Sequence, residues 1–300
     1  MKKFLLVSLL VALLAIPAFA AEFSKDKLVV GTEFSYAKKD IENLNLVNLG
    51  IGSWLSGSLT QKTSDVKLWE ALVTVGYKLS DNLTPYGIVG AGYLNFDQDL
   101  VGDIQIGHHS ASASLLGTEF RDSMALVLGA GAKGDLLKFD NGLILGYDTR
   151  WTTFSANSKE NKMVVIEDFV IDNKQKVSYG EFNFDLLASK EFLLNDKTKD
   201  ADGQWRNSKG EFVKAPEGME KYTPRAITPI VGARYTHVDM LYKNNMTLDC
   251  VSVGIESEVQ GGMVSGLVGA KIDINKSLSA SVSGILGQEM GVQLKVAYNF

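Results

Sequence analysis

The chain alternates apolar and polar residues with a period of two, in segments of about ten residues separated by polar or glycine-rich stretches. Successive side chains of a strand point to opposite faces, so this pattern predicts strands with one apolar and one polar face. The last segment is the clearest, because Val292, Leu294 and Val296 alternate with Gln293 and Lys295. The pattern predicts ten strands, at 27–38, 66–79, 84–96, 122–136, 142–154, 178–191, 226–241, 262–274, 277–286 and 290–300.

The lengths of the connections distinguish a membrane barrel from a soluble sandwich. Short links at 80–83, 137–141 and 275–276 alternate with long ones at 40–65, 97–121, 156–176 and 242–261. Tight periplasmic turns and long external loops are typical of outer-membrane barrels. The sequence therefore predicts an all-β fold, a transmembrane antiparallel up-and-down β-barrel of about ten strands with both termini in the periplasm. The external loops could bind a surface ligand.

Two segments leave the strand count open, with eight or twelve strands as alternatives. The link at 192–224 is too long for a periplasmic turn, although a small hairpin around Gln204 to Val213 could account for part of it. The stretch from Cys250 to Ile255 also alternates, and it fits either a further strand or an extension of one.

The first twenty residues have the features of a signal peptide. Lys2 and Lys3 precede an apolar run that ends at Pro17, and small residues follow up to Ala20. We expect cleavage after Ala20, a single barrel domain over 21–300, and export to the outer membrane of a Gram-negative-type bacterium. The apolar run is too short to cross a bilayer as a helix.

Composition and charge exclude several classes of partner. The formal net charge of -5 becomes about -7 without the two signal-peptide lysines, and the sequence has no basic cluster of the kind that nucleic-acid binding requires. The single cysteine, Cys250, has no intramolecular disulfide partner, and Ala21 is not a lipid-attachment cysteine. We expect no cofactor, no metal and no nucleic acid, and outer-membrane lipid as the main partner.

Aromatic residues cluster near the ends of the predicted strands, where the two interfacial girdles of a membrane barrel would lie. The turn-side girdle would contain Tyr77, Tyr86, Tyr298 and Phe300, and the loop-side girdle would contain Tyr36, Trp69, Phe96 and Trp151.

The chain ending at Phe300 resembles the terminal β-signal of outer-membrane proteins, in which alternate apolar residues lead to a final Phe. This resemblance implies recognition by the barrel-assembly machinery through Val296, Tyr298 and Phe300. The stretches 77–93 and 229–235 resemble hairpins of opacity-like and porin-like small barrels. The resemblance implies a structural or surface-display barrel, or a narrow non-specific porin, and it assigns no functional residues.

The predicted inward faces carry acidic and basic residues in nearly equal numbers, which favours a cross-linked interior over a strongly selective lumen. A ten-stranded barrel lies close to the size that side chains fill. A plugged interior and a narrow pore lined by the same charges remain the two alternatives. The predicted lumen-facing charges are Glu33, Glu70, Lys78, Lys133, Asp135, Asp148, Arg150, Glu181, Asp185, Arg234, Lys271, Asp273 and Lys295.

Enzymatic activity is the alternative hypothesis, and we expect none. Omptin proteases resemble this layout, because they are ten-stranded barrels with an Asp-x-Asp pair and an Asp/His pair at the rim. Asp97 and Asp99 provide the first pair, but His237 and Asp239 run in the reverse order to the second. His108 and His109 are adjacent residues that would project apart in an extended chain, so they do not indicate a metal site.

Overall fold

The computed structural model describes residues 27–41, 43–51, 55–106, 109–121, 124–157, 162–165, 169–199, 202–207, 209–218, 223–248 and 251–300. The predicted signal peptide lies outside these residues. Within them, no helix is both long and apolar enough to cross a membrane.

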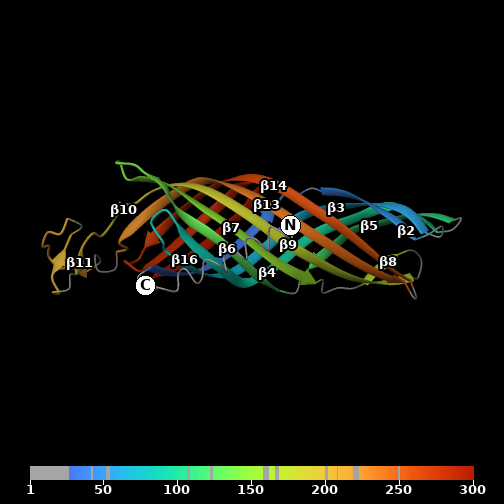
Figure 1. Cartoon of the computed structure of the whole chain (residues 1–300), viewed down its shortest axis with the longest axis horizontal. Helices are drawn as coiled ribbons and strands as arrows, with labels where there is room; N and C mark the ends of the chain where they lie inside the picture. Colours follow the sequence, from blue (N-terminus) through green and yellow to red (C-terminus); the bar gives the residue numbers. More distant parts are fainter. Residues whose placement is uncertain are drawn as a thin grey trace.

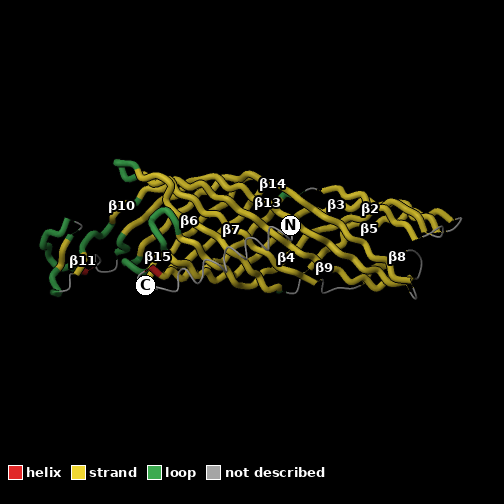
Figure 2. Tube along the Cα trace, in the orientation of Figure 1, coloured by secondary structure: helices red, strands yellow, loops and turns green. Residues whose placement is uncertain are grey.

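Ten antiparallel strands form one closed barrel, which confirms the predicted fold class and settles the strand count (Figures 1 and 2). Each strand pairs with the next around the wall, and the last pairs with the first, so the sheet closes on itself. The strands are β1 (Leu28–Lys39), β3 (Leu55–Tyr77), β4 (Thr84–Ile106), β6 (Ala125–Lys138), β7 (Leu143–Asn157), β9 (Phe169–Lys190), β13 (Ala226–Leu248), β14 (Val251–Asp273), β15 (Leu278–Gly287) and β16 (Glu289–Asn299).

Much of the four long links is strand rather than loop, which corrects the predicted boundaries. β3, β4, β13 and β14 each run for 23 residues, so the stretch after Cys250 is an extension of β14. Short strands pair against these extensions: β2 (Asn43–Ile51) on β3, β5 (His109–Arg121) on β4, and β8 (Lys162–Val165) on β9. They lie together at one end of the barrel (Figure 1).

The long strands reach well beyond the thickness of a bilayer. A strand of 23 residues is roughly 75 Å long, and a tilt of about 40° leaves some 57 Å along the barrel axis. The apolar band of an outer-membrane barrel is only about 25 Å tall. More than half of each 23-residue strand therefore projects from the membrane, on the side opposite the short turns.

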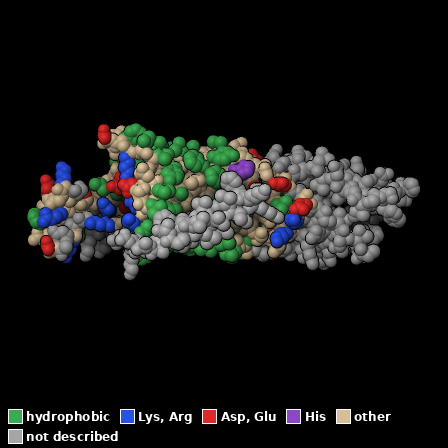
Figure 3. Space-filling view, viewed as in Figure 1, with side chains coloured by type: hydrophobic (Ala, Val, Ile, Leu, Met, Phe, Trp, Pro, Cys, Tyr) green, Lys and Arg blue, Asp and Glu red, His purple; other side chains and the backbone are tan. Residues whose placement is uncertain are grey.

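Apolar side chains cover the outer wall of the turn-side half (Figure 3). The predicted outward faces are the exposed ones, with Phe34 on β1, Val73 on β3 and Val296 on β16 each at least 40% exposed. The third predicted strand, whose facing the sequence left ambiguous, points Ile88 and Leu94 inward and Val89 outward.

The prediction of the girdles is wrong for Tyr86 and Phe96. Both lie on β4, whose facing the sequence left ambiguous. Phe96 is buried inside the barrel, and the hydroxyl of Tyr86 donates a hydrogen bond to Asp148 inside the wall. Tyr36 and Trp69 do lie together on the outer wall, with their ring centroids 4.3 Å apart.

The segment after β9 contains the small hairpin that the sequence suggested. β10 (Phe192–Leu193) extends the wall against β13, and β11 (Thr198–Lys199) pairs with β12 (Trp205–Arg206) beyond the turn end of the barrel (Figure 1). The predicted hairpin runs from Trp205 to Val213, and the Val213 N–H donates a hydrogen bond to the carbonyl oxygen of Trp205 at 2.8 Å. Gly210, with φ of +81°, occupies the left-handed position in its turn.

Candidate functional site: the filled barrel interior

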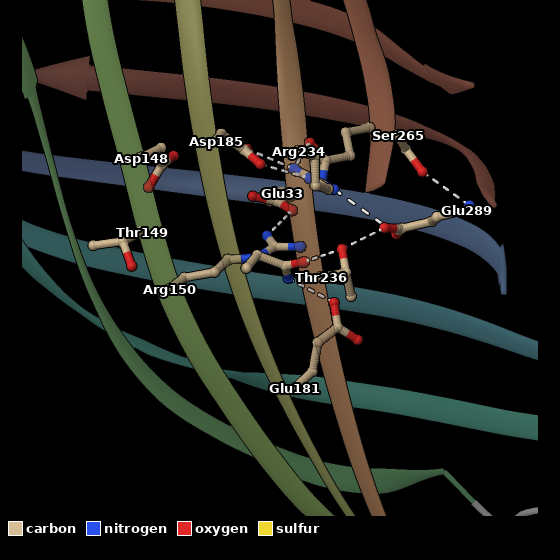
Figure 4. A network of polar contacts seen from close by, with 12 residues as sticks. Glu33, Asp148, Thr149, Arg150, Glu181, Asp185, Arg234, Thr236, Ser265 and Glu289 are labelled. Atoms are coloured by element: carbon tan, nitrogen blue, oxygen red, sulfur yellow. Dashed lines mark hydrogen bonds and ion pairs between the residues drawn. The ribbon is translucent and has the colours of Figure 1, made fainter. Parts of the chain in front are cut away.

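A polar network fills the barrel at the level of the outer apolar belt (Figure 4). It is built from inward side chains of six strands, because every second residue of β1, β3, β7, β9, β13 and β16 points to the axis. Its buried charged members are Glu33, Lys39, Glu70, Arg150, Glu181, Asp185, Arg234 and Glu289. Buried charges of this kind require partners, so the contacts of each determine what the site can do.

Arg234 and Asp185 form a bidentate ion pair between neighbouring strands. Arg234 Nε and one terminal nitrogen each donate to an Asp185 carboxylate oxygen at 2.7 Å. The two residues lie directly opposite each other on β13 and β9. Arg234 also donates to Gln293 of β16 at 3.3 Å, which links two strands that are not neighbours in the wall.

Glu181 accepts hydrogen bonds from three side chains. Lys39 of β1 approaches one carboxylate oxygen at 2.8 Å, and the hydroxyl of Tyr179 donates to the same oxygen at 2.5 Å. The amide of Asn183 donates to the other oxygen at 2.6 Å. Since β1 and β9 are not neighbours in the wall, the Lys39 contact crosses the interior.

Glu289 and Thr236 connect these two groups. Glu289 lies 3.9 Å from a terminal nitrogen of Arg234, contacts Lys39 at 3.2 Å and accepts a hydrogen bond from Thr236 at 2.7 Å. Thr236 Oγ1 is also 2.7 Å from the side-chain oxygen of Asn183. These contacts join β1, β9, β13 and β16 in one continuous network.

Glu33 lies at the turn-side end of the network. Arg150 of β7 donates to one of its oxygens at 2.5 Å, and Lys295 of β16 approaches the other at 3.2 Å. Lys295 is also 3.7 Å from Asp148. The Tyr86 ring lies over Gly131, where a Cβ would come within 2.4 Å of the ring, so glycine at this position gives the Tyr86 hydroxyl access to Asp148.

Glu70 is the buried acid with the weakest set of partners. Ser35 donates to one of its carboxylate oxygens at 3.3 Å, and the other oxygen has no hydrogen-bond partner among the described residues. Among the described residues, Glu70 also has no ion-pair partner within 4 Å. Glu70 therefore marks the least satisfied position in the network.

An apolar core fills the barrel on the loop side of this network, a feature that the sequence analysis missed. Along β13, inward Arg234 and Thr236 give way to Val238, Met240 and Tyr242. β3, β4, β6, β7, β9 and β14 also contribute, and Ile41 lies just after the end of β1. The core comprises Ile41, Val66, Leu68, Leu72, Ile88, Leu94, Phe96, Ala125, Val127, Phe154, Ala156, Val177, Tyr179, Val238, Met240, Tyr242, Val259 and Met263. Leu72 and Ile88 form its turn-side end, at the level of Glu33.

Aromatic contacts show that this core spans the lumen. Phe96 of β4 and Tyr242 of β13 meet edge-on with ring centroids 6.4 Å apart, although three strands separate β4 from β13 in the wall. Phe154 and Tyr179 stack with centroids 4.9 Å apart. The interior is therefore packed with apolar side chains above the membrane and with paired charges within it.

A small cavity of about 40 Å³, lined by both polar and apolar side chains, lies below the network, toward the turn end. Its lining includes Glu33, Tyr86, Lys133, Asp148 and Lys295. A cavity of this size has room for about one water molecule. It is too small for a solute path, and the ion pairs of Glu33 close its upper side.

Five of the predicted lumen charges lie at or near the turn-side mouth rather than in the buried network. Lys133 lines the small cavity, and Lys271 contacts Asp273 at 3.1 Å. Asp135 contacts Lys138 at 3.3 Å. Lys78 differs from the expectation, because it lies beyond the end of β3 and is half exposed in the turn.

Asp81 organises the charges of this mouth. Lys78 and Lys138 approach its two carboxylate oxygens at 2.8 and 2.9 Å. Hydrogen bonds from these two lysines lower the pKa of Asp81 from 3.8 to about 2. The contacts tie the β3–β4 turn to the end of β6.

Lys39 and Glu289 are the charged network members that the sequence analysis did not identify. Both lie one residue outside a predicted strand, after 38 and before 290. Their directly opposite positions on β1 and β16 would have identified them once the strands were extended by one residue.

Of the candidate catalytic residues, the structure describes the side chains of His237 and Asp239. His237 and Asp239 lie on the outward face of β13, since Thr236, Val238 and Met240 point inward. The side chains of Asp97 and Asp99 lie outside the described residues, as do His108 and the side chain of His109. Groups of three or more potential metal ligands are absent from the residues that are described.

Three outward side chains at the C-terminal end are exposed on the wall: Val296, Tyr298 and Phe300. β16 pairs with β15 on one side and with β1 on the other, so it closes the barrel. Its recognition by the assembly machinery stays a prediction.

Solved outer-membrane barrels are similar to the chain in overall form. The outer membrane protease OmpT from Escherichia coli matches with 10% identity and a TM-score of 0.43, over 94% of this chain and 99% of that one. The translocator domain of autotransporter NalP from Neisseria meningitidis matches with 9% identity and a TM-score of 0.36, over 95% and 91%. A FadL homologue from Pseudomonas aeruginosa matches with 10% identity and a TM-score of 0.26, over 92% and 91%.

These likenesses are too distant to assign an activity. No protein-family model matches the chain, and no curated protein is similar to it in sequence. The resemblance to opacity-like barrels therefore stays a prediction. The chain has the fold of an outer-membrane β-barrel, and its function has to be argued from its own residues.

Proposed function

We propose that this protein is a non-conducting, non-enzymatic barrel of a Gram-negative-type outer membrane, which holds its long strand extensions above the surface as a rigid display platform. In this proposal residues 1–20 direct export and are removed. The barrel-assembly machinery then inserts the remaining chain with its turns in the periplasm.

The observation that carries the proposal is the filled interior. A pore requires a continuous polar path, whereas here the paired charges of Glu33, Glu181 and Arg234 lie beneath an apolar core that spans the lumen. Ions would have to cross both layers. An ion that enters an apolar layer loses its hydration without compensation, which costs many kcal/mol.

The position in the membrane is supported by the outer wall. Exposed apolar residues cover the turn-side half, and Tyr36 and Trp69 mark its loop-side limit. Beyond them the outward positions become polar, as at Lys38 on β1 and at His237 and Asp239 on β13. This limit corresponds to the outer interface of a bilayer.

The outward orientation of His237 and Asp239, away from the barrel interior, supports the absence of enzymatic activity. A water-activating pair would have to converge on one site with the Asp97 and Asp99 carboxylates.

Planar-bilayer recording of the purified, folded protein tests the closed interior. We expect no stable openings at moderate voltage. Stable, reproducible openings would overturn the proposal in favour of a narrow porin. Cleavage of a peptide library that disappears in His237→Ala would overturn it in favour of a protease.

Display at the cell surface is tested with paired epitope insertions. A tag placed between Leu248 and Val251, at the link between β13 and β14, should bind antibody on intact cells. The matched tag between Asp140 and Asn141, in the short turn after β6, should bind only after the outer membrane is permeabilised. The opposite pattern would show that the orientation is reversed.

A further inference from the structure

Glu70 of β3 is a buried acid with no cation of its own among the described residues. Its side chain is 3% exposed, and Ser35 of β1, which lies directly opposite, donates to one carboxylate oxygen at 3.3 Å. The other oxygen has no hydrogen-bond partner in the described part of the chain. An ionised carboxylate buried in this way loses its hydration with little compensation.

The nearest neighbours of Glu70 within the wall are neutral. Gly92 of β4 lies opposite it on the side away from β1, and Leu68 and Leu72 are the next inward residues along β3. The charges that act on Glu70 therefore come from across the interior or from further along β1. The titratable groups that face it from these strands are Glu33 and Lys39 of β1, Arg150 of β7, and Tyr179 and Glu181 of β9.

Both cations in this set already contact another acid. Arg150 donates to Glu33 at 2.5 Å (Figure 4). Lys39 lies 2.8 Å from Glu181 and 3.2 Å from Glu289. An ionised Glu70 would add a further carboxylate to two cations that are already shared, and it would be repelled by Glu33 and Glu181.

The charges of the described interior leave one acid in excess. The buried network contains five acids and three bases, and the lining of the small cavity adds Asp148, Lys133 and Lys295. The ion pairs at the turn-side mouth balance one another. Every acid of the network and the cavity other than Glu70 has a cation within 4 Å. The excess charge is therefore assigned to Glu70.

A proton fits this position better than a metal ion does. Glu70 is not part of the lining of the small cavity, and Leu68 and Leu72 pack on either side of it. Groups of three or more potential metal ligands are absent from the described residues. A protonated carboxyl is neutral and gains an O–H donor, which can donate to the Ser35 hydroxyl.

We propose that Glu70 carries a proton in the folded barrel, and that a rise in pH, which favours the loss of this proton, weakens the filled interior. The inference goes beyond the proposed function, which requires only that the interior is filled. It makes the seal of the lumen sensitive to pH at one residue.

The pH dependence of unfolding in lipid vesicles tests the proposal. A free glutamate is ionised above about pH 5, so unfolding releases the proton of Glu70 into solution. The folded barrel then binds one proton more than the unfolded chain, and its unfolding equilibrium constant rises about tenfold for each pH unit. Glu70→Gln, which resembles the protonated acid in size and charge, has no such proton to release.

The measured quantity is the unfolding constant of the parent divided by that of Glu70→Gln, because other titrating groups affect both proteins alike. We expect this ratio to rise about tenfold from about pH 5 to about pH 6. The matched control is Glu256→Gln, the same substitution at an exposed acid that pairs with Lys243. The ratio of the parent to this control should not change with pH.

Infrared spectroscopy of the folded protein gives a second measurement. At about pH 6 the parent should show the C=O band of a protonated carboxyl, and Glu70→Gln should lack this band. Identical spectra in this region, or a ratio of unfolding constants that is independent of pH, would show that Glu70 is ionised and overturn the proposal. Failure of Glu70→Gln to fold would overturn it too, because a neutral amide should be tolerated. None of these outcomes would open the lumen, so the proposed function is tested separately by the bilayer recordings.

Discussion

Replacement of Arg234 by Met should be among the most destabilising single changes in this barrel. Arg234 and Asp185 are only 1% and 8% exposed, and two hydrogen bonds of 2.7 Å join them. Asp185 also lies directly opposite Asp148 on β7, so it faces a second acid across the strand pair. Without Arg234, the Asp185 carboxylate would be buried and unpaired, which costs about 3–5 kcal/mol of unfolding free energy.

A second substitution separates the charge effect from packing. Asp185→Leu on top of Arg234→Met removes the orphaned carboxylate, while Glu289 keeps its contacts to Lys39 and Thr236. We expect the double variant to be at least about 2 kcal/mol more stable than the sum of the two single losses implies. Replacing a buried ion pair by apolar residues is often close to neutral.

Urea unfolding of the protein in lipid vesicles, followed by tryptophan fluorescence, measures these free energies. The matched control is Lys243→Met, which removes an ion pair to Glu256 in which both side chains are about half exposed. An exposed pair of this kind contributes at most about 1 kcal/mol. If the losses of the two single variants simply add in the double variant, Arg234 stabilises the interior by its volume and the argument from charge is wrong.

Three further predictions follow from the same structure. Val73→Arg, on the lipid-facing wall, should lower the unfolding free energy by roughly 2–4 kcal/mol, whereas Tyr298→Arg at the turn-side interface should cost about 0–1 kcal/mol; equal costs would contradict the assigned depth. Asp81, whose pKa is lowered to about 2, should stabilise the protein above its ordinary pKa of 3.8 and lose this effect as the pH falls toward 2. Unfolding midpoints across that window should therefore vary less in Asp81→Asn than in the parent protein. Mass spectrometry of protein from outer membranes should give a chain that begins at Ala21, and an intact Met1 would refute the predicted signal peptide.

The barrel could be predicted from the sequence because the lipid-facing half of each strand is apolar at alternate positions. β16 shows this directly, since Val292, Leu294 and Val296 are exposed and Gln293 is buried. The prediction failed on β4, where the run from Pro85 to Gly92 is glycine-rich and has no clear polar face. Tyr86 and Phe96 were placed in the girdles for that reason, whereas both point inward.

The interior was only partly predictable, because its contacts are of two kinds. Lys39 with Glu289 and Arg234 with Asp185 are directly opposite on neighbouring strands, so a correct register yields them. Contacts that cross the lumen do not follow from register. Arg150 with Glu33 joins β7 to β1, and this pairing depends on the shear and diameter of the closed barrel.

The loop-side core was missed because the sequence analysis assumed that the apolar face of every strand points outward. In the extensions the inward residues are apolar and the outward residues are polar, as at Val238 and Asp239. Each still alternates with a period of two. The sequence therefore predicts where the strands lie. To predict where the apolar face of a strand changes from outward to inward, one must also know the position of the bilayer.

This reversal at the aromatic girdle fixes the height of the barrel in its bilayer. A shift toward the periplasm would draw Lys38 and Lys67 below the interface, where the cost for each rises from about 0–1 kcal/mol toward roughly 2–4 kcal/mol at the midplane. A shift outward would lift Phe34 toward water. In the proposed orientation, the extensions would have to cross the membrane before their apolar interior could close. Their polar outer surface would then oppose withdrawal of the barrel toward the periplasm.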